Sequence, residues 1–155
     1  YIGWHDWRSL RGWALLCWFG VLVGLMILGG LLMQVLGVTP SDMMLKLIQS
    51  ANPLLVIVMM VVGAPLVEEL FFRGFMFKGL QHSRVGAIGA VVITAVIWAV
   101  IHGGQYSLAE VSYLMVLGLL FGYARLKTGA LCLPLALHVA NNLIAVVSAL
   151  IWGVG

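Results

Sequence analysis

The chain has 155 residues, of which 63% are hydrophobic and only 8% are charged, and its mean hydropathy is +1.14. Soluble domains average about 25% charged residues, so this composition excludes an ordinary soluble globular protein. The net charge of +3 comes from lysines and arginines near the ends of apolar runs. This placement favours contact with phospholipid headgroups and argues against nucleic-acid binding.

Five apolar runs are predicted to be membrane-spanning helices, because a span requires about 20 mostly apolar residues. They cover residues 13–36, 53–80, 85–101, 108–126 and 131–152. The short connections favour antiparallel packing of consecutive helices. The predicted fold is therefore an all-α, polytopic transmembrane helix bundle of about five spans, forming one domain over residues 1–155. Residues 43–49 are expected to form a short interfacial helix. The first residue is Tyr1 rather than Met, so we expect that an N-terminal portion of the protein is missing from this sequence. The number of predicted spans is therefore a minimum.

The basic residues at the ends of these runs predict the orientation of the chain. One is predicted on one side of the membrane and six on the other: Lys46 against Arg8, Arg11, Lys78, Arg84, Arg125 and Lys127. Positive charge accumulates on the cytoplasmic side, so we expect a cytoplasmic N-terminus and an external C-terminus. Tryptophans beside the first arginines are predicted to be interfacial anchors: Trp4, Trp7 and Trp13.

Two pairs of glycines spaced four residues apart predict close approach between helices. The pairs are Gly20 with Gly24 and Gly118 with Gly122. We interpret both pairs as packing surfaces within one chain, with a dimer interface as the alternative.

The second run contains three charged residues, Glu68, Glu69 and Arg73, within the sequence VEELFFRG. A charged residue at the centre of a membrane helix costs roughly 2.5 to 3.5 kcal/mol on insertion scales, so these residues require a compensating role. Glu69 and Arg73 are four residues apart and are predicted to pair on one helix face. Glu68 points about 100° away, without a local cation, and is a candidate general base.

The third and fifth runs carry further polar groups at helical spacing. Trp98 and His102 are four residues apart, as are His138 and Asn142, so each pair shares one helix face. Asn141 is expected to face elsewhere and to bond to a neighbouring helix.

Polar groups from three separate apolar runs form a sharper pattern together than any one of them does alone. The set supplies a carboxylate, two imidazoles and an amide: Glu68, His102, His138 and Asn142. It provides a base and oxyanion donors without a Ser or Cys nucleophile, so it predicts a hydrolytic site inside the membrane. The other histidines, His5 and His82, lie outside the runs and are interpreted as bystanders.

Three motifs resemble those of the CPBP family of intramembrane proteases, which includes CAAX proteases, bacteriocin-processing proteins and Abi proteins. The matches are Glu68, Glu69 and Arg73 for EExxxR, Trp98 and His102 for FxxxH, and His138 and Asn142 for HxxxN. The motifs agree in order and spacing, and the family-like core covers about residues 53–152. Trp98 replaces the usual Phe, which preserves an aromatic side chain beside His102.

The resemblance implies an intramembrane endopeptidase in a prokaryotic inner membrane. Glu68 and His102 would activate water, and His138 and Asn142 would stabilise the developing oxyanion. Glu69 with Arg73 would hold the helix and tune Glu68. The substrate would be a lipidated peptide, a leader peptide or a segment of a membrane protein.

Two alternatives stay open. Glu68, His102 and His138 could bind a catalytic zinc ion with an open position for water, although the leading hypothesis requires no cofactor. The chain could instead be a non-proteolytic immunity or accessory subunit that binds and stabilises a membrane protein complex.

The predicted site also has to satisfy a geometric condition. Counted along straight helices, Glu68 lies about 15 Å from the basic end of its helix, whereas His102 lies about 27 Å from the basic end of its own. Helix tilt, or an interfacial path for residues 84–89, must bring the two side chains level.

Overall fold

The computed structural model describes residues 12–39, 41, 43–50 and 52–152, which form helices joined by short connections. In chain order the elements are α1 (Gly12–Val35), α2 (Met43–Ser50), α3 (Pro53–Val58), η2 (Met59–Gly63), α4 (Ala64–Glu69), η3 (Leu70–Met76), α5 (Phe77–Gln81), α6 (Gly86–Val100), α7 (Leu108–Thr128) and α8 (Cys132–Trp152). The all-α prediction is confirmed, and the short helix expected at residues 43–49 is present as α2.

Within the described residues, four helices are long and apolar enough to cross a membrane: Gly12–Val35, Pro53–Gln81, Leu108–Thr128 and Cys132–Ile151. The second is one continuous run from α3 to α5. Helix α6 has 15 residues, or about 22 Å, which is less than a hydrocarbon core of about 30 Å. The chain is therefore an integral, multi-pass membrane protein in which the third predicted span is a shorter apolar helix. Four residues of the predicted N-terminal belt lie outside the described residues: Trp4, Trp7, Arg8 and Arg11.

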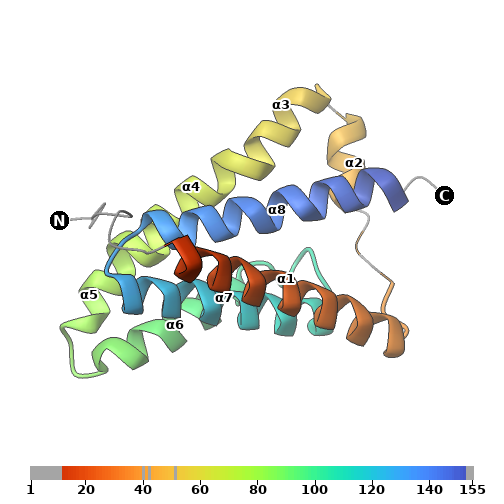
Figure 1. Cartoon of the computed structure of the whole chain (residues 1–155). Coiled ribbons are helices and arrows are strands. Elements are labelled where there is room, and N and C mark those ends of the chain that lie inside the picture. Colours follow the sequence, from red (N-terminus) through yellow and green to blue (C-terminus); the bar gives the residue numbers. More distant parts are fainter. Residues whose placement is uncertain (1–11, 40, 42, 51, 153–155) are drawn as a thin grey trace.

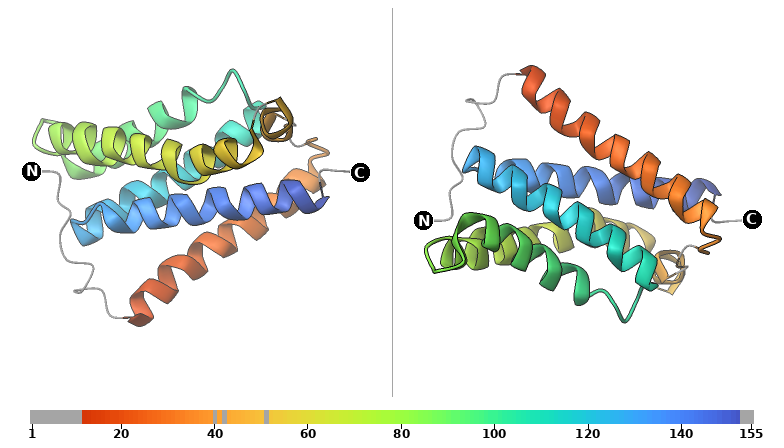
Figure 2. Two further views of the ribbon diagram at one scale, coloured as in Figure 1. Left: turned by 90° about the horizontal axis from the view of Figure 1, so that it is seen from above. Right: turned by 90° about the horizontal axis from the view of Figure 1, so that it is seen from below.

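The helices run alternately in opposite directions along the bundle, with α5 at one end and α2 at the other (Figure 1). Figure 2 shows α1 inclined to α7 and α8, so its N-terminal half diverges from them. In agreement, Trp13 is 65% exposed near the start of α1, whereas Leu22 is buried further along the helix. The angle of α1 thus limits its packing to its later turns.

The second long helix changes its winding on both sides of Glu68 and Glu69. It begins at Asn52, whose side chain accepts a hydrogen bond from the backbone N–H of Leu55. The π-helical segments η2 and η3 lie directly before and after α4. Pro65 at the start of α4 has no backbone N–H and cannot continue the regular hydrogen-bond ladder at this junction. Single π turns inside α-helices are frequent at functional sites.

Helices α6 and α7 approach closely at the predicted glycine pair. A Cβ atom at Gly118 would lie 3.1 Å from Cα of Ala95 and 3.2 Å from the ring of Trp98. A Cβ atom at Gly122 would lie 3.1 Å from Val91. The prediction that this pair forms a packing surface is confirmed.

The corresponding prediction for α1 is wrong. Gly20 and Gly24 are exposed, and no atom of the described residues lies within 4 Å of a Cβ built at either position. Helix α1 instead packs through Gly29, against the ring of Tyr113 in α7. The tilt of α1 brings a different glycine to the contact than the sequence spacing suggested.

Both ends of α7 are capped by local hydrogen bonds. Ser107 and Glu110 form a capping box at its start, and Gly129 adopts a φ of 66° at its end. Arg125, in the last turn, is buried and donates to the backbone carbonyls of Arg73 and Gly129. Counting Arg125 among the charges that face the headgroups was therefore wrong, because its guanidinium joins α7 to η3.

Candidate active site

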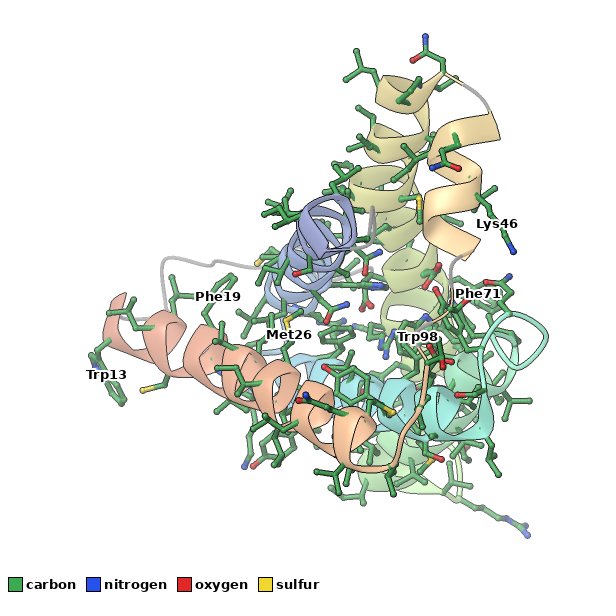
Figure 3. All side chains as sticks on the ribbon, turned by 90° about the vertical axis from the view of Figure 1, so that its right-hand side faces the viewer. Trp13, Phe19, Met26, Lys46, Phe71 and Trp98 are labelled. Atoms are coloured by element: carbon green, nitrogen blue, oxygen red, sulfur yellow. The ribbon has the colours of Figure 1, made fainter. Side chains whose placement is uncertain are left out.

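A cavity of about 340 Å³ lies between α1, η2, α4, α6, α7 and α8. All four side chains predicted to be catalytic line it: Glu68, His102, His138 and Asn142. Figure 3 shows Trp98 in the interior of the bundle, whereas Lys46 points outward from α2. The fold thus brings together polar residues from three separate apolar segments.

Glu68 is held by an indole. Its Oε2 accepts a hydrogen bond from Nε1 of Trp98 at 2.5 Å and lies 3.9 Å from Nε2 of His138. The side chain is 22% exposed, so the carboxylate faces the cavity while one of its oxygens is engaged by the protein. The sequence indicated that Glu68 has no local cation, but it did not indicate this donor from α6.

Glu69 is fully buried and binds two partners. Its Oε1 accepts a hydrogen bond from Arg73 at 2.8 Å, which confirms the predicted ion pair. The same oxygen lies 2.9 Å from Nδ1 of His138. A carboxylate is an acceptor, so Nδ1 carries the proton in this contact and Nε2 is directed toward Glu68. Glu69 therefore orients the imidazole as well as pairing with the arginine.

Arg73 is buried inside an aromatic enclosure. Its guanidinium carbon lies 5.2 Å from the ring centre of Trp98 and 5.5 Å from that of Phe121. Nη2 also donates to the backbone carbonyl of Gly118 at 3.1 Å. Ion pairing, cation–π contacts and this hydrogen bond together offset part of the cost of removing the cation from water.

His102 lies just beyond the end of α6 and is fixed by its own helix. Its Nδ1 is 2.7 Å from the carbonyl oxygen of Trp98, so Nδ1 is the donor and Nε2 is left for the cavity. The two rings meet edge to face at 5.1 Å. Helix α6 already begins at Gly86, so no long interfacial path precedes it. His102 nevertheless reaches the cavity of Glu68, because the helices are not parallel straight rods (Figure 2).

Asn142 bridges α8 and η2. Its Nδ2 donates to the backbone carbonyl of Met60 at 2.9 Å, and its Oδ1 accepts a hydrogen bond from Nδ2 of Asn141 at 3.1 Å. A primary amide has two N–H groups, so one remains for a ligand. The expectation that Asn141 faces elsewhere is wrong: it lines the same cavity and bonds within its own helix. A separation of about 100° does not remove its amide from a cavity of this width.

The alternative zinc ligands do not fit a metal ion as they are arranged. Within the described ranges, no group of three or more His, Cys, Asp or Glu side chains is placed to hold a metal. We therefore derive no catalytic step through zinc.

Two further residues line the cavity that motif spacing did not indicate, Tyr106 and Glu110. Burial raises the pKa of the Tyr106 phenol, and the charges of Glu110 and Glu68 raise it further, so this group stays neutral. Glu110 accepts hydrogen bonds from the backbone N–H groups of Ser41 and Ser107. The sequence SLAE at residues 107–110 is a capping-box signal, but nothing in the sequence indicates Tyr106.

The fold and the cavity define a polytopic membrane protein with a carboxylate, imidazole and amide site inside its helix bundle. The model of the family described as Type II CAAX prenyl endopeptidase Rce1-like matches residues 50–144. This match covers more than half of the chain, so the chain belongs to that family, and the resemblance inferred from the three motifs is confirmed.

Several bacterial proteins are similar to this chain. The membrane-embedded CAAX protease MroQ of Staphylococcus aureus is 29% identical over 138 residues, covering 84% of this chain and 54% of MroQ. YdiL of Bacillus subtilis, named as a candidate membrane peptidase, is 28% identical over 145 residues, covering 89% of this chain and 56% of YdiL. An uncharacterised 24.3 kDa protein of Escherichia coli is 29% identical over 123 residues, covering 76% and 54%. The chain spans about half the length of these relatives, and no solved structure matches it.

Proposed function

We propose that the chain contains the catalytic core of an intramembrane endopeptidase that hydrolyses a peptide bond near the membrane. The observation that carries this proposal is the convergence of four predicted residues on one cavity: Glu68, His102, His138 and Asn142. Ionisable groups inside a membrane helix bundle are costly to bury and mark functional sites. Membership of a prenyl endopeptidase family supports the same activity.

In the proposed reaction, Glu68 takes a proton from a water molecule as the water oxygen adds to the peptide carbonyl. Glu68 then gives this proton to the amine nitrogen as the C–N bond breaks. His102 positions this water through Nε2, since its Nδ1 is bound to Trp98. With a proton on both ring nitrogens, His138 donates from Nδ1 to Glu69 and from Nε2 to the oxygen that gains charge. The second N–H of Asn142 donates to the same oxygen. A positioned base and preorganised donors each lower the barrier, and neither role requires a metal.

A second cavity supports access for an apolar substrate segment. This groove, of about 580 Å³, runs along α2, α3, η2 and α4 and is lined almost wholly by aliphatic residues and methionines. It shares Met60, Ala64 and Glu68 with the active-site cavity. We propose that an apolar part of a lipidated peptide, leader peptide or membrane protein lies in this groove and presents its peptide bond to Glu68.

The remaining charges support the proposed orientation in a bacterial inner membrane. Helix α5, which contains Lys78 and is followed by Arg84, lies at the end of the bundle opposite α2, which contains Lys46 (Figure 1). Lys127, in the last turn of α7, lies at the same end of the bundle as α5. Without Arg125, the α5 end of the bundle still carries more basic residues than the α2 end. This inequality favours a cytoplasmic location for the α5 end.

The decisive variant is Glu68→Gln, which keeps the side-chain shape and removes the base. Cleavage of a quenched-fluorescent peptide by purified protein in liposomes is expected to fall about 10²- to 10⁴-fold. Glu110→Gln is the matched control, because this carboxylate lines the same cavity but binds backbone N–H groups. Its rate is expected to stay within a few fold. Full activity in an inserted Glu68→Gln variant would overturn the role of Glu68 as the base, whereas absence of cleavage by the unaltered protein would favour the immunity or accessory function.

A metal measurement on the same preparation tests the metal-free mechanism. Proteolysis is expected to survive prolonged chelation. Stoichiometric zinc in the active protein, together with loss of activity on chelation and recovery with zinc, would contradict the proposal.

A further inference from the structure

Trp98 contacts four ionisable groups in and beside the proposed active site: Glu68, Arg73, His102 and His138. It is only 2% exposed, and its indole N–H donates to Glu68. Its ring meets the imidazoles of His102 and His138 edge to face, at 5.1 and 5.3 Å, and lies 5.2 Å from the guanidinium carbon of Arg73. Filling space between helices requires only the ring, whereas the contact with Glu68 uses the polar N–H.

The hydrogen bond to Glu68 distinguishes the two oxygens of its carboxylate. Oε2 accepts from the indole, while Oε1 has no hydrogen-bond partner among the described residues. A carboxylate on a flexible side chain samples several rotamers, and a charge-assisted hydrogen bond selects one of them. Selecting a rotamer in advance lowers the cost of placing the base against a water molecule.

The position of the indole is itself determined by its neighbours. Gly118 in α7 provides the space for the ring, since a Cβ atom there would lie 3.2 Å from Cε3 of Trp98. Phe121 packs against the indole edge to face at 6.0 Å. Close packing against Gly118 and Phe121 therefore fixes the indole of Trp98. A group that positions another side chain has to be fixed in this way.

We infer that Trp98 is a positioning residue whose indole N–H holds Oε2 of Glu68, so that Oε1 is presented to the water molecule. The inference rests on the proposed function. Phenylalanine, the residue expected at this place from the resemblance, supplies a ring but no donor. In this chain the base is accordingly oriented by a hydrogen bond that a phenylalanine at this position could not make.

The rate test compares Trp98→Phe with Trp18→Phe, measured with a quenched-fluorescent peptide that carries a farnesylated cysteine beside the scissile bond. Trp18 packs against the same hydrophobic core, and its ring is tilted against that of Tyr123 with the centroids 6.0 Å apart, so its variant controls for the loss of an indole. For Trp98→Phe we expect kcat to fall about 10- to 100-fold with KM nearly unchanged. An unchanged kcat, with Glu68→Gln inactive, would overturn the inference and leave the proposed function standing. Activity retained by Glu68→Gln would overturn the role of Glu68 as the base, and absence of cleavage by the unaltered protein would overturn the proposed function itself.

A second measurement needs no substrate. In protein labelled with ¹⁵N-tryptophan in bicelles, the indole N–H signal of Trp98 is assigned by its loss in Trp98→Phe. In Glu68→Gln this signal is expected to move substantially, because its acceptor changes from a carboxylate to an amide, while the Trp18 signal stays in place. A Trp98 signal that does not respond to Glu68→Gln would contradict the hydrogen bond and with it the inference.

Discussion

Among single residues, Glu69 has two roles in the proposed site: it neutralises the buried guanidinium of Arg73, and it binds the imidazole of His138. Its Oε1 is bound by Arg73 and by His138, while its Oε2 and Nε of Arg73 have no hydrogen-bond partner among the described residues. Breaking a buried ion pair by removing one partner costs more than the pair contributes, because the other charge stays buried alone. Glu69 therefore links the stability of the bundle to the orientation of an imidazole in the proposed site.

A prediction at this scale concerns Glu69→Leu. Loss of the carboxylate leaves Arg73 unpaired, so the free energy of unfolding in detergent or bicelles is expected to fall by about 3 to 5 kcal/mol. Adding Arg73→Met should recover most of this loss, because an apolar pair of similar volume has no charge to desolvate.

The same pair of variants separates stability from positioning. Proteolysis by the Glu69→Leu, Arg73→Met double variant is expected to remain low, since Nδ1 of His138 still lacks its acceptor. Recovery of both stability and full activity would show that Glu69 has no role in orienting His138.

At the scale of helices, close approach is decided by which face of each helix meets a neighbour. The α6–α7 contact uses Gly118 and Gly122, and the α1–α7 contact uses Gly29, whereas Gly20 and Gly24 face away from the rest of the described chain. Small residues allow backbones to approach only where a second helix is present. Two glycines spaced four residues apart therefore form a packing surface in α7. The pair with the same spacing in α1 packs against no other part of the described chain.

The matched prediction compares Gly118→Leu with Gly20→Leu. Both changes replace glycine by a better helix former, so intrinsic helix propensity cancels in the comparison. Gly118→Leu is expected to lower the free energy of unfolding by about 1 to 3 kcal/mol through overpacking against Ala95 and Trp98. Gly20→Leu should have little effect. Equal stability of the two variants would contradict the packing assigned to α7.

At the scale of the whole molecule, the alternation of helices sets which connections share a side of the membrane. The α5–α6 turn near Ser83 and the α6–α7 connection at residues 101–107 are separated by the length of α6. Figure 1 shows α2 at the end of the bundle away from α5. The proposed orientation places the α5–α6 turn in the cytoplasm.

This orientation is tested by labelling single cysteines, after Cys17 and Cys132 have been changed to Ala. Ser83→Cys and Gly104→Cys both replace exposed residues in connections. An impermeant maleimide is expected to react with the cysteine at position 104 in spheroplasts and with the one at position 83 in inside-out vesicles. The reverse pattern would overturn the orientation, and labelling of both from one side would overturn the topology.

Properties that depend on local pattern follow from the order of the amino acids alone. Membrane helices follow from the length and apolar character of each run, and the predicted boundaries agree with α1, α7 and α8 to within two residues. The Glu69–Arg73 pair also follows from local geometry, because residues four apart meet on any helix. The motifs indicated the family without any knowledge of how the helices pack.

Contacts between distant groups, in contrast, depend on how the helices pack. Trp98 donates to Glu68 across 30 positions of sequence, and His138 meets Glu69 across 69. These contacts depend on the rotation and tilt of each helix, which are set by packing against neighbours and leave no periodic signal in the chain. The catalytic roles of Glu68 and its partners remain predictions, whereas their shared cavity is a property of the packed bundle.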